Sequence, residues 1–323
     1  IHLAGMNIFL VVSFVGSVSA FGKIFVTRSI ASLFHKRSES FIKERHIHKT
    51  SVHPSMIYAR SASFAMSTSY TTADEARNAV NDEADSSKVA GVSRFFKTGK
   101  GEYGEGDVFI GATVPSVRKV AKLCIDMPLS ETSRLLDSEV HEVRLLGLII
   151  MTYQFQKKEE SHKEIHDLYI AKLSRVNNWN LVDSSAPQIL GAYLYEQGRG
   201  EKKSSTGRAK LDELAISTSL WERRIAIIAT QFFIRNDEFD DTIRIANTLL
   251  NDPHDLIHKA VGWMLREVGK RKLKVLTDFL NQNAAEMPRT MLRYAIEKLP
   301  PAKRRQYLNK RAPPPPEEGE ESD

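Results

Sequence analysis

The stretch His141-Glu-Val-Arg-Leu-Leu-Gly-Leu-Ile-Ile-Met-Thr152 decides the fold class of this chain. Its residues Leu145, Leu148, Ile149 and Thr152 fall on one face of a helix with 3.6 residues per turn. The same spacing returns at residues 225–232 and runs almost without interruption from residue 74 to residue 308. No sustained two-residue alternation occurs there, so we expect helices and no sheet.

Proline and capping residues divide this helical region into short segments. Pro115 is expected in the first turn of a helix and Ser130 at a helix cap. Further breaks are expected at Pro187, Pro253, Pro288 and Pro300–Pro301. Stacked pairs of helices of roughly 12–18 residues are typical of HEAT and armadillo repeats, which run about 40 residues each. We therefore predict an all-α fold, a curved α-solenoid of degenerate HEAT/armadillo-like repeats over residues 73–311.

Two segments depart from the helical pattern. Residues 97–106 contain four glycines and are expected to form a loop. This loop is not a phosphate-binding loop of the usual kind, because it lacks the Gly-Lys-Ser/Thr ending and a preceding strand. Residues 197–207 are rich in Gly, Lys and Ser, which predicts a flexible insertion between helices.

The two ends differ from the middle in composition. Residues 7–20 form a short apolar run that ends in small residues, as a signal peptide does, and the run is too short for a comfortable membrane span. A Ser- and Arg-rich stretch follows to about Thr72 and resembles a transit peptide. We therefore interpret residues 1–72 as a mostly disordered targeting leader. Residues 312–323 are predicted to be a Pro-rich acidic disordered tail.

The compartment follows from how the leader is interpreted. Met6 is the expected start of the protein, and a signal followed by a transit stretch resembles the bipartite plastid-targeting leader of algae with secondary plastids. A mitochondrial leader is the alternative organellar interpretation. An internal start at Met66 would give a nuclear or cytosolic form.

Charge and cysteine content narrow the class of protein. The formal net charge is +6, residues 1–72 carry eight Lys/Arg against two acids, and the tail carries five acids and no base. The helical region thus keeps a modest positive excess, which suits a polyanion partner and equally suits a soluble surface. The single cysteine, Cys124, excludes a disulfide framework and a cysteine-built zinc site, and its apolar neighbours predict a core position.

The segment Asn178-Trp-Asn-Leu-Val-Asp183 is the first candidate for chemistry. Trp179 and Asp183 are four residues apart, so on a helix they share one face. An aromatic face beside a carboxylate stabilises positive charge. The alternative is a core tryptophan and a solvated or capping acid.

Two further segments carry aromatic and basic residues. In Ser219-Leu-Trp-Glu-Arg-Arg224, Trp221 is expected in the core, and Arg223 and Arg224 cannot face the same way. One of them is free to bind phosphate or carboxylate, unless both form intramolecular salt bridges. In residues 257–267, Gly262 allows close backbone approach beside Trp263. Lys259, Trp263 and Arg266 make up a basic and aromatic stripe there. The positive patch is extended by Lys270, Arg271, Lys272 and Lys274.

Taken in order, five segments resemble the AlkD family of DNA alkylation repair proteins. They are Gly-Glu-Tyr-Gly-Glu-Gly-Asp-Val-Phe-Ile-Gly111, Asn-Trp-Asn-Leu-Val-Asp183, Leu-Trp-Glu-Arg-Arg224, His-Lys-Ala-Val-Gly-Trp-Met-Leu-Arg266 and Met-Pro-Arg-Thr-Met-Leu-Arg293. The resemblance implies a C-shaped solenoid that cradles duplex DNA. It also implies a catalytic pocket of Trp179, Asp183, Arg224 and Trp263, with Arg223, Lys259, Arg266, Lys270 and Arg271 as candidates for DNA binding.

The resemblance implies a monofunctional DNA glycosylase, a base excision repair enzyme that releases N3- or N7-alkylated purines from duplex DNA. In that role Asp183 stabilises an oxocarbenium-like sugar and positions water, and Arg224 holds a backbone phosphate. No cofactor or metal is expected, although His162/His166 and His254/His258 are spaced as ligand pairs. We expect a monomer without stable membrane association. The alternatives are a non-catalytic HEAT-repeat DNA-binding or scaffold protein and a protein–protein adaptor.

Overall fold

The computed structural model describes residues 69–198 and 205–310 of the 323-residue chain. Helices dominate these residues, and extended backbone pairing within them is limited to an isolated parallel bridge between Val108 and Val140. The all-α prediction is confirmed. The predicted leader up to residue 68, most of the predicted insertion at 199–204 and the tail from residue 311 lie outside the described residues.

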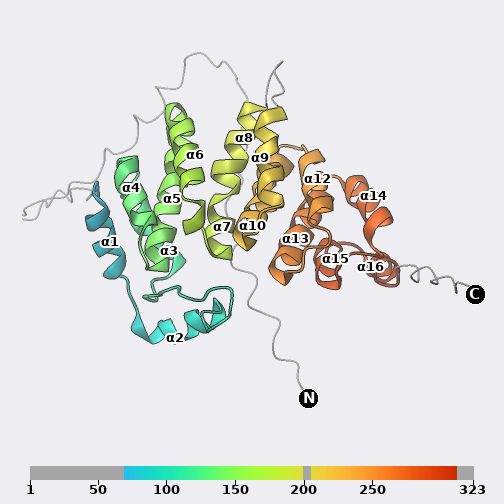
Figure 1. Cartoon of the computed structure of the whole chain (residues 1–323), viewed down its shortest axis with the longest axis horizontal. Coiled ribbons are helices and arrows are strands. Elements are labelled where there is room, and N and C mark those ends of the chain that lie inside the picture. Colours follow the sequence, from blue (N-terminus) through green and yellow to red (C-terminus); the bar gives the residue numbers. More distant parts are fainter. Residues whose placement is uncertain (1–68, 199–204, 311–323) are drawn as a thin grey trace, which may run out of the picture. The chain divides into compact units, whose positions relative to one another are not determined.

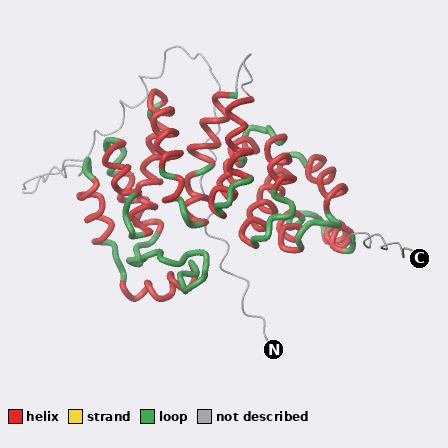
Figure 2. The backbone as a smooth tube through the Cα atoms, viewed as in Figure 1, coloured by secondary structure: helices red, strands yellow, loops and turns green. Residues whose placement is uncertain are grey.

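Most of the described connections between helices are short, and the long one is residues 96–113 between α2 and α3 (Figures 1 and 2). The α-helices are α1 Ala73–Asn81, α2 Ser86–Phe95, α3 Val114–Lys122, α4 Leu129–Leu136, α5 His141–Lys157, α6 His162–Ala171, α7 Trp179–Ser185, α8 Ala192–Gln197, α9 Ser205–Ala215, α10 Leu220–Ala229, α11 Gln231–Arg235, α12 Asp240–Thr248, α13 Asp255–Arg271, α14 Leu273–Asn283, α15 Arg289–Ala295 and α16 Pro301–Leu308. Two short 3₁₀ turns, η1 Glu159–Ser161 and η2 Leu173–Arg175, flank α6, and η3 Pro187–Gly191 is a π-helix. Among the described helices only α5 and α13, with 17 residues each, reach the expected length, and the others are shorter.

Local sequence explains most helix starts. Thr72 and Glu75 form a capping box at α1, because each side chain accepts a hydrogen bond from the other residue's backbone. Pro115 lies in the first turn of α3, as predicted. Ser130 is not a cap, because α4 already begins at Leu129. The Pro128 carbonyl accepts from the backbone of residues 131 and 132, so the proline itself starts the helix.

A helix end was predicted at Pro187, but the structure has none there. An α-helical bond from residue 187 to the Asp183 carbonyl is impossible, because proline has no N–H. The chain instead widens into the π-turn η3, where Gly191 donates to the Ala186 carbonyl at 2.9 Å, and it continues into α8. Asp183 therefore lies one turn before a local irregularity of a kind that is frequent at functional sites.

The helices stack in sequence order. Helix α5 is buried on nearly all sides and packs on α3, α4 and α7. Helices α5, α7, α10, α13 and α15 each contact the next, and α9, α12 and α14 pack against this row from their own repeats (Figure 1). Cys124 is fully buried in the core, as predicted. Among the described residues no helix is both long and apolar enough to cross a membrane.

Two glycines let helices approach backbone to backbone. A Cβ atom on Gly262 of α13 would lie 2.5 Å from the Met291 carbonyl oxygen of α15. A Cβ on Gly191 would lie 2.2 Å from the Ala229 carbonyl oxygen at the end of α10. Any side chain at these positions forces the helices apart. The close approach predicted at Gly262 is confirmed.

Candidate active site on helices α7, α10 and α13

Helix α7 presents the first candidate pair. Asn178 caps the helix, and its side-chain oxygen accepts the Trp179 N–H at 2.8 Å. Trp179 is thus the first helical residue, and Asp183 follows one turn later on the same face. Both side chains are only partly buried, whereas Leu181 and Val182 between them are in the core. The sequence prediction that Trp179 and Asp183 share a face of a helix holds.

Arg224 holds Asp183 in a bidentate ion pair. The arginine Nε and Nη2 atoms donate to Asp183 Oδ1 and Oδ2, both at 2.9 Å. Its Nη1 donates to the Leu256 carbonyl oxygen of α13 at 2.7 Å. The arginine side chain is 6% exposed and the aspartate side chain 16% exposed. One guanidinium therefore ties α7, α10 and α13 together and leaves part of the carboxylate open.

The environment of Asp183 raises the pKa of its carboxyl group above the ordinary aspartate value. Burial is the main cause, and the charge and hydrogen bonds of Arg224 oppose it. The carboxylate thus combines a raised affinity for protons with a partner that favours the ionised form. A perturbed carboxyl of this kind marks a candidate functional group.

One face of the Trp179 indole is covered by a neighbouring ring. Phe96, just after α2, stacks on the indole with ring centres 5.0 Å apart and planes 13° from parallel. Phe95 meets Trp179 edge to face at 5.7 Å and is itself 52% exposed. Phe96 therefore keeps a flat ligand group off the indole face that it covers, and Trp179 as a whole stays only partly buried.

The glycine-rich loop brings a second aromatic group to this place. Tyr103 lies edge to face with Trp221 at 5.9 Å between ring centres. Burial raises the pKa of the Tyr103 phenol, while a hydrogen bond with Trp179 and the charges of Lys259 and Arg224 act against that. Residues 97–106 thus form a loop, as predicted, and that loop borders the site. Trp221, predicted in the core, is only partly buried.

The fourth predicted pocket residue stands somewhat apart. Trp263 lies on α13, one turn beyond Lys259, and its indole N–H donates to Glu267 Oε1 at 3.2 Å. Within the described residues it shares no hydrogen bond or ring contact with Trp179, Asp183 or Arg224. The structure thus places Trp179, Asp183 and Arg224 together and puts Trp263 on the adjoining helix.

The predicted DNA-binding cations all have acidic partners within the chain. The pairs are Arg223–Asp252, Lys259–Asp255, Arg266–Glu297, Lys270–Glu267 and Arg271–Asp237. The Arg223 side chain is 15% exposed and also donates to two backbone carbonyl groups. Arg223 and Arg224 therefore both follow the salt-bridge alternative. The role of these five cations in DNA binding stays a prediction.

The predicted ligand-like histidine pairs have other partners. His162 is hydrogen bonded to Glu196 and to the Phe155 carbonyl group, and His166 to Asp167. His258 is bonded to the Asp252 carbonyl group, and His254 accepts from the backbone of α13. No group of three or more metal-binding side chains is present in the part of the chain that the structure describes.

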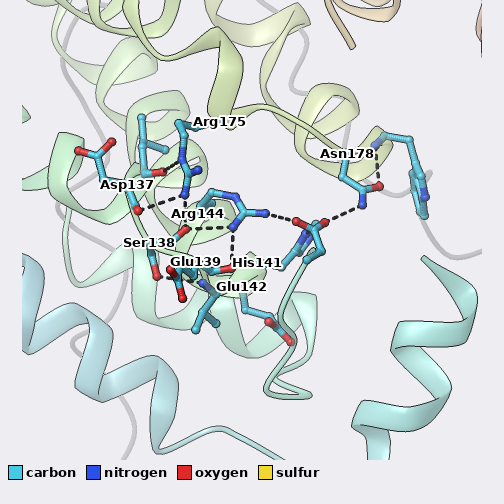
Figure 3. Close-up of polar contacts among 12 residues, drawn as sticks. Asp137, Ser138, Glu139, His141, Glu142, Arg144, Arg175 and Asn178 are labelled. Carbon is cyan, nitrogen blue, oxygen red and sulfur yellow. Dashed lines mark hydrogen bonds and ion pairs between the residues drawn. The ribbon is translucent and has the colours of Figure 1, made fainter. Parts of the chain in front are cut away.

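Sequence reasoning missed a buried polar network beneath the start of α7 (Figure 3). Arg144, His141 and Asn178 meet at the Asp107 carboxylate, which is 4% exposed. Burial alone would raise the pKa of Asp107, but bonds from His141 and Asn178 and the Arg144 charge lower it below the ordinary value. The signal in the sequence was an aspartate directly after a run of glycines.

Stacked helix pairs with a partly open aspartate–arginine pair between aromatic side chains define a helical-repeat protein with a candidate active site. Residues 76–299 match the family described as DNA alkylation repair enzyme, and the chain belongs to that family. Membership gives it a role in DNA alkylation repair, with DNA as the substrate.

Two bacterial proteins are among the solved structures that the chain matches. One, titled a predicted DNA alkylation repair enzyme from Enterococcus faecalis, has a TM-score of 0.50 and 15% identity, over 67% of this chain and 97% of the other. This likeness shows a shared fold. The structure of smu.31 from Streptococcus mutans UA159 has a TM-score of 0.39 and 19% identity, over 69% and 95% of the two chains. No curated protein matches the chain significantly.

Proposed function

We propose that this protein is a DNA glycosylase that hydrolyses the N-glycosidic bond of purines alkylated at N3 or N7 in duplex DNA. The observation that carries the proposal is the partly exposed carboxylate of Asp183, held by Arg224 one turn from the partly buried Trp179. Family membership supplies the class of substrate. The Asp183–Arg224 pair supplies a carboxylate that can stabilise the positive charge that develops on the sugar.

Alkylation at N3 or N7 gives the purine a positive charge, so the base leaves without a general acid. The sugar that remains develops oxocarbenium character, and a water molecule must attack it. A fixed anion close to the sugar lowers the energy of that transition state, and a removal of such a group typically costs about 100- to 1000-fold in rate. Asp183 supplies the anion, and its oxygens keep lone pairs that can orient water.

Arg224 has a different primary role here from the one that the sequence suggested. Its Nε and Nη2 are committed to Asp183 and its Nη1 to the Leu256 carbonyl group. We infer that Arg224 keeps Asp183 ionised and oriented, since bidentate pairing fixes the plane of the carboxylate. N–H groups left on the two Nη atoms remain available to a backbone phosphate.

The aromatic residues complete the proposed site. The exposed part of Trp179 can pack on the deoxyribose and favour its cationic form. Trp263 on α13 can approach the same sugar from the adjoining helix. Tyr103 closes the site on the side of the glycine-rich loop, where its ring meets Trp221.

The DNA backbone needs positive charge near this site. Arg94 and Lys100 are exposed near Phe95 and form no ion pair within the described residues. On α16, Lys303, Arg304 and Arg305 are also exposed and form no ion pair among those residues. Unpaired cations gain more from a phosphate than cations already neutralised by Asp or Glu. We infer that they add to the contacts expected from Lys259, Arg266, Lys270 and Arg271.

The test measures free bases. The full chain is incubated with duplex DNA that carries N7-methylguanine, under single-turnover conditions, and the released base is quantified. The wild type is expected to release it, and Asp183→Asn to lose about 100-fold or more in rate while its Kd for the duplex stays within about twofold. Binding without release by the wild type would instead support a non-catalytic DNA-binding protein.

A matched control uses a second buried acid. Asp241 on α12 is 3% exposed and pairs with Arg208 and Arg244, away from the candidate site. Asp241→Asn removes a buried charge in the same way and is expected to keep the rate of base release. Equal losses in the two variants would remove the special role of Asp183.

A further inference from the structure

The buried network under α7 centres on one carboxylate. Asp107 Oδ2 accepts from Asn178 Nδ2 at 2.8 Å and lies 2.9 Å from His141 Nδ1. Its Oδ1 accepts from Arg144 Nη2, and Arg144 Nη1 donates to the carbonyl groups of residues 138 and 139 (Figure 3). The arginine side chain is 2% exposed. Asp107 is therefore fixed to the beginning of α5 by charge and hydrogen bonds.

Asn178 passes this attachment on to Trp179. Its side-chain amino group donates to Asp107, and its side-chain carbonyl oxygen accepts the Trp179 N–H. Asn178 is fully buried, so both ends of the amide are committed within the protein. A short unbroken chain of hydrogen bonds thus runs from Arg144 through Asp107 and Asn178 to the backbone of the residue that carries the indole.

A column of rings connects the same segments. The His141 ring stacks on Phe109 at 4.4 Å, Phe109 stacks on Phe96 at 5.0 Å, and Phe96 stacks on Trp179 at 5.0 Å. Asp107 lies two residues before Phe109 and contacts His141 directly. The hydrogen-bond chain positions the Trp179 backbone and the ring column positions its side chain. Asp107 is part of the hydrogen-bond chain. It also contacts His141 at one end of the ring column and is joined through Asn178 to Trp179 at the other end.

The glycine-rich loop is held close to this chain. A Cβ atom on Gly104 would lie 2.3 Å from the Phe96 carbonyl oxygen and 3.4 Å from Asn178 Nδ2. The Gly104 N–H donates to the Lys97 carbonyl group, and the Asp107 N–H donates to the Gly104 carbonyl group. The loop therefore ends on Asp107 in a conformation that leaves no room for rearrangement beside Asn178.

We propose that Asp107 is a positioning residue for Trp179: it joins the glycine-rich loop, α5 and the first turn of α7, and it thereby fixes the orientation of the indole beside Asp183. The consequence for catalysis rests on the proposed glycosylase function. The link between Asp107 and Trp179 does not rest on that function, and it can be measured without any substrate.

The experiment uses the three tryptophans as reporters. The full chain contains only Trp179, Trp221 and Trp263, so labelling with 5-fluorotryptophan gives three ¹⁹F resonances, assigned with single Trp→Phe variants. In Asp107→Asn the Trp179 resonance is expected to move or broaden, and those of Trp221 and Trp263 to stay. The rate of N7-methylguanine release is expected to fall about tenfold or more at unchanged duplex Kd, because a displacement of about 1 Å can cost 100-fold.

Two variants separate positioning from general stability. Asn178→Ser keeps a good helix cap but is too short to reach Asp107, so it should reproduce the change at Trp179 with a small loss of stability. It keeps the inference testable if Asp107→Asn does not fold. The exchange Asp107→Asn with Asn178→Asp reverses donor and acceptor between the two side chains and keeps a good cap. It also takes the carboxylate away from Arg144 and His141, so it should restore the resonance and the rate only in part.

The control is Asp241→Asn, which loses stability through another buried ion pair and should leave the Trp179 resonance and the rate of base release unchanged. An unmoved Trp179 resonance in both Asp107→Asn and Asn178→Ser overturns the inference. If the wild type releases no base while the resonance responds as expected, the proposed function fails and the positioning link stands. If release persists at the wild-type rate in the variants, only the catalytic consequence fails.

Discussion

Two buried aspartate–arginine pairs lie on either side of the start of α7, and they differ in how completely the carboxylate is enclosed. Asp107 and Arg144 are 4% and 2% exposed, and His141 and Asn178 add further bonds to the same carboxylate. Asp183 is 16% exposed and receives hydrogen bonds from Arg224. The pKa of Asp107 is lowered and that of Asp183 is raised.

The difference shows what separates a structural pair from a chemical one in this fold. A carboxylate with bonds from three different residues has its lone pairs satisfied and nothing left to offer a substrate. A carboxylate with one partner, at the border of the solvent, is oriented but still has unused lone pairs. The same two residue types thus serve opposite purposes, and the first three of the five predictions below test that contrast directly.

The largest expected effect is on stability. Asp107→Ala leaves Arg144 buried without its carboxylate, and removal of one partner of a buried pair typically costs about 3–5 kcal/mol. Asp183→Ala leaves Arg224 closer to solvent, so the free energy of unfolding should fall by about 1–3 kcal/mol. Urea unfolding of both variants measures the two costs. Equal costs would mean that the two pairs do not differ as described.

The next effect is a pH interval in which the protein is folded but inactive. Folding lowers the pKa of Asp107, so its contribution to stability is complete above the ordinary aspartate pKa and is lost as pH falls through the lowered value. Asp183, whose pKa is raised, takes up its proton at a higher pH. On acidification the excision rate should therefore fall before the circular dichroism signal does. A blank without enzyme corrects for spontaneous loss of the base.

Arg224→Lys sharpens the same measurement. A lysine cannot reproduce the bidentate geometry, so the pKa of Asp183 should rise further and the acid limb of the rate profile should move to higher pH. The midpoint of acid unfolding, which depends on Asp107, should move less. An acid limb that stays in place would assign it to a group other than Asp183.

A smaller effect is expected at Phe96, whose ring lies between the two regions. Phe96→Leu nearly conserves volume, so the free energy of unfolding should fall by less than about 1.5 kcal/mol. Leucine cannot stack on Trp179, so base release should slow by a larger factor than this loss of stability suggests. Single-turnover rates and urea unfolding of one preparation give both numbers. Phe155→Leu, at a ring that stacks on His162 away from the site, is the matched control.

The smallest effects concern single surface cations. Each phosphate contact adds about 0.9 to the slope of log K against log salt. Lys100→Ala should lower the slope by about that amount, since Lys100 has no acidic partner among the described residues. Lys270→Ala should lower it by less, because Glu267 already neutralises Lys270. The reverse order would show that the duplex displaces Glu267.

Much of the fold followed from the sequence because helical periodicity depends on neighbours along the chain. Pro115 and Gly262 have the predicted roles. Ser130 and Pro187 do not, because α4 starts one residue before Ser130 and the chain passes Pro187 as a π-helix. The spacing of Trp179 and Asp183 was likewise a local matter.

The contacts between distant segments could not be read from the sequence. The Asp107–Asn178 bond joins residues 71 positions apart, and Arg224–Asp183 joins residues 41 apart. Nothing near Arg224 in the sequence shows whether its partner is a phosphate or an aspartate of the same chain. All of the predicted leader except residues 69–72, and the whole predicted tail, lie outside the described residues, and the compartment stays a prediction.

The contact at Gly262 has a consequence for how this protein can vary. Where side chains fill an interface, a substitution can be absorbed by a change of rotamer. Where α13 meets α15 at a glycine and the Met291 carbonyl group, the separation is set by main-chain atoms that every sequence shares. Substitutions among packed side chains can therefore be absorbed locally, while the distance between α13, which carries Trp263, and α15 depends on Gly262 itself.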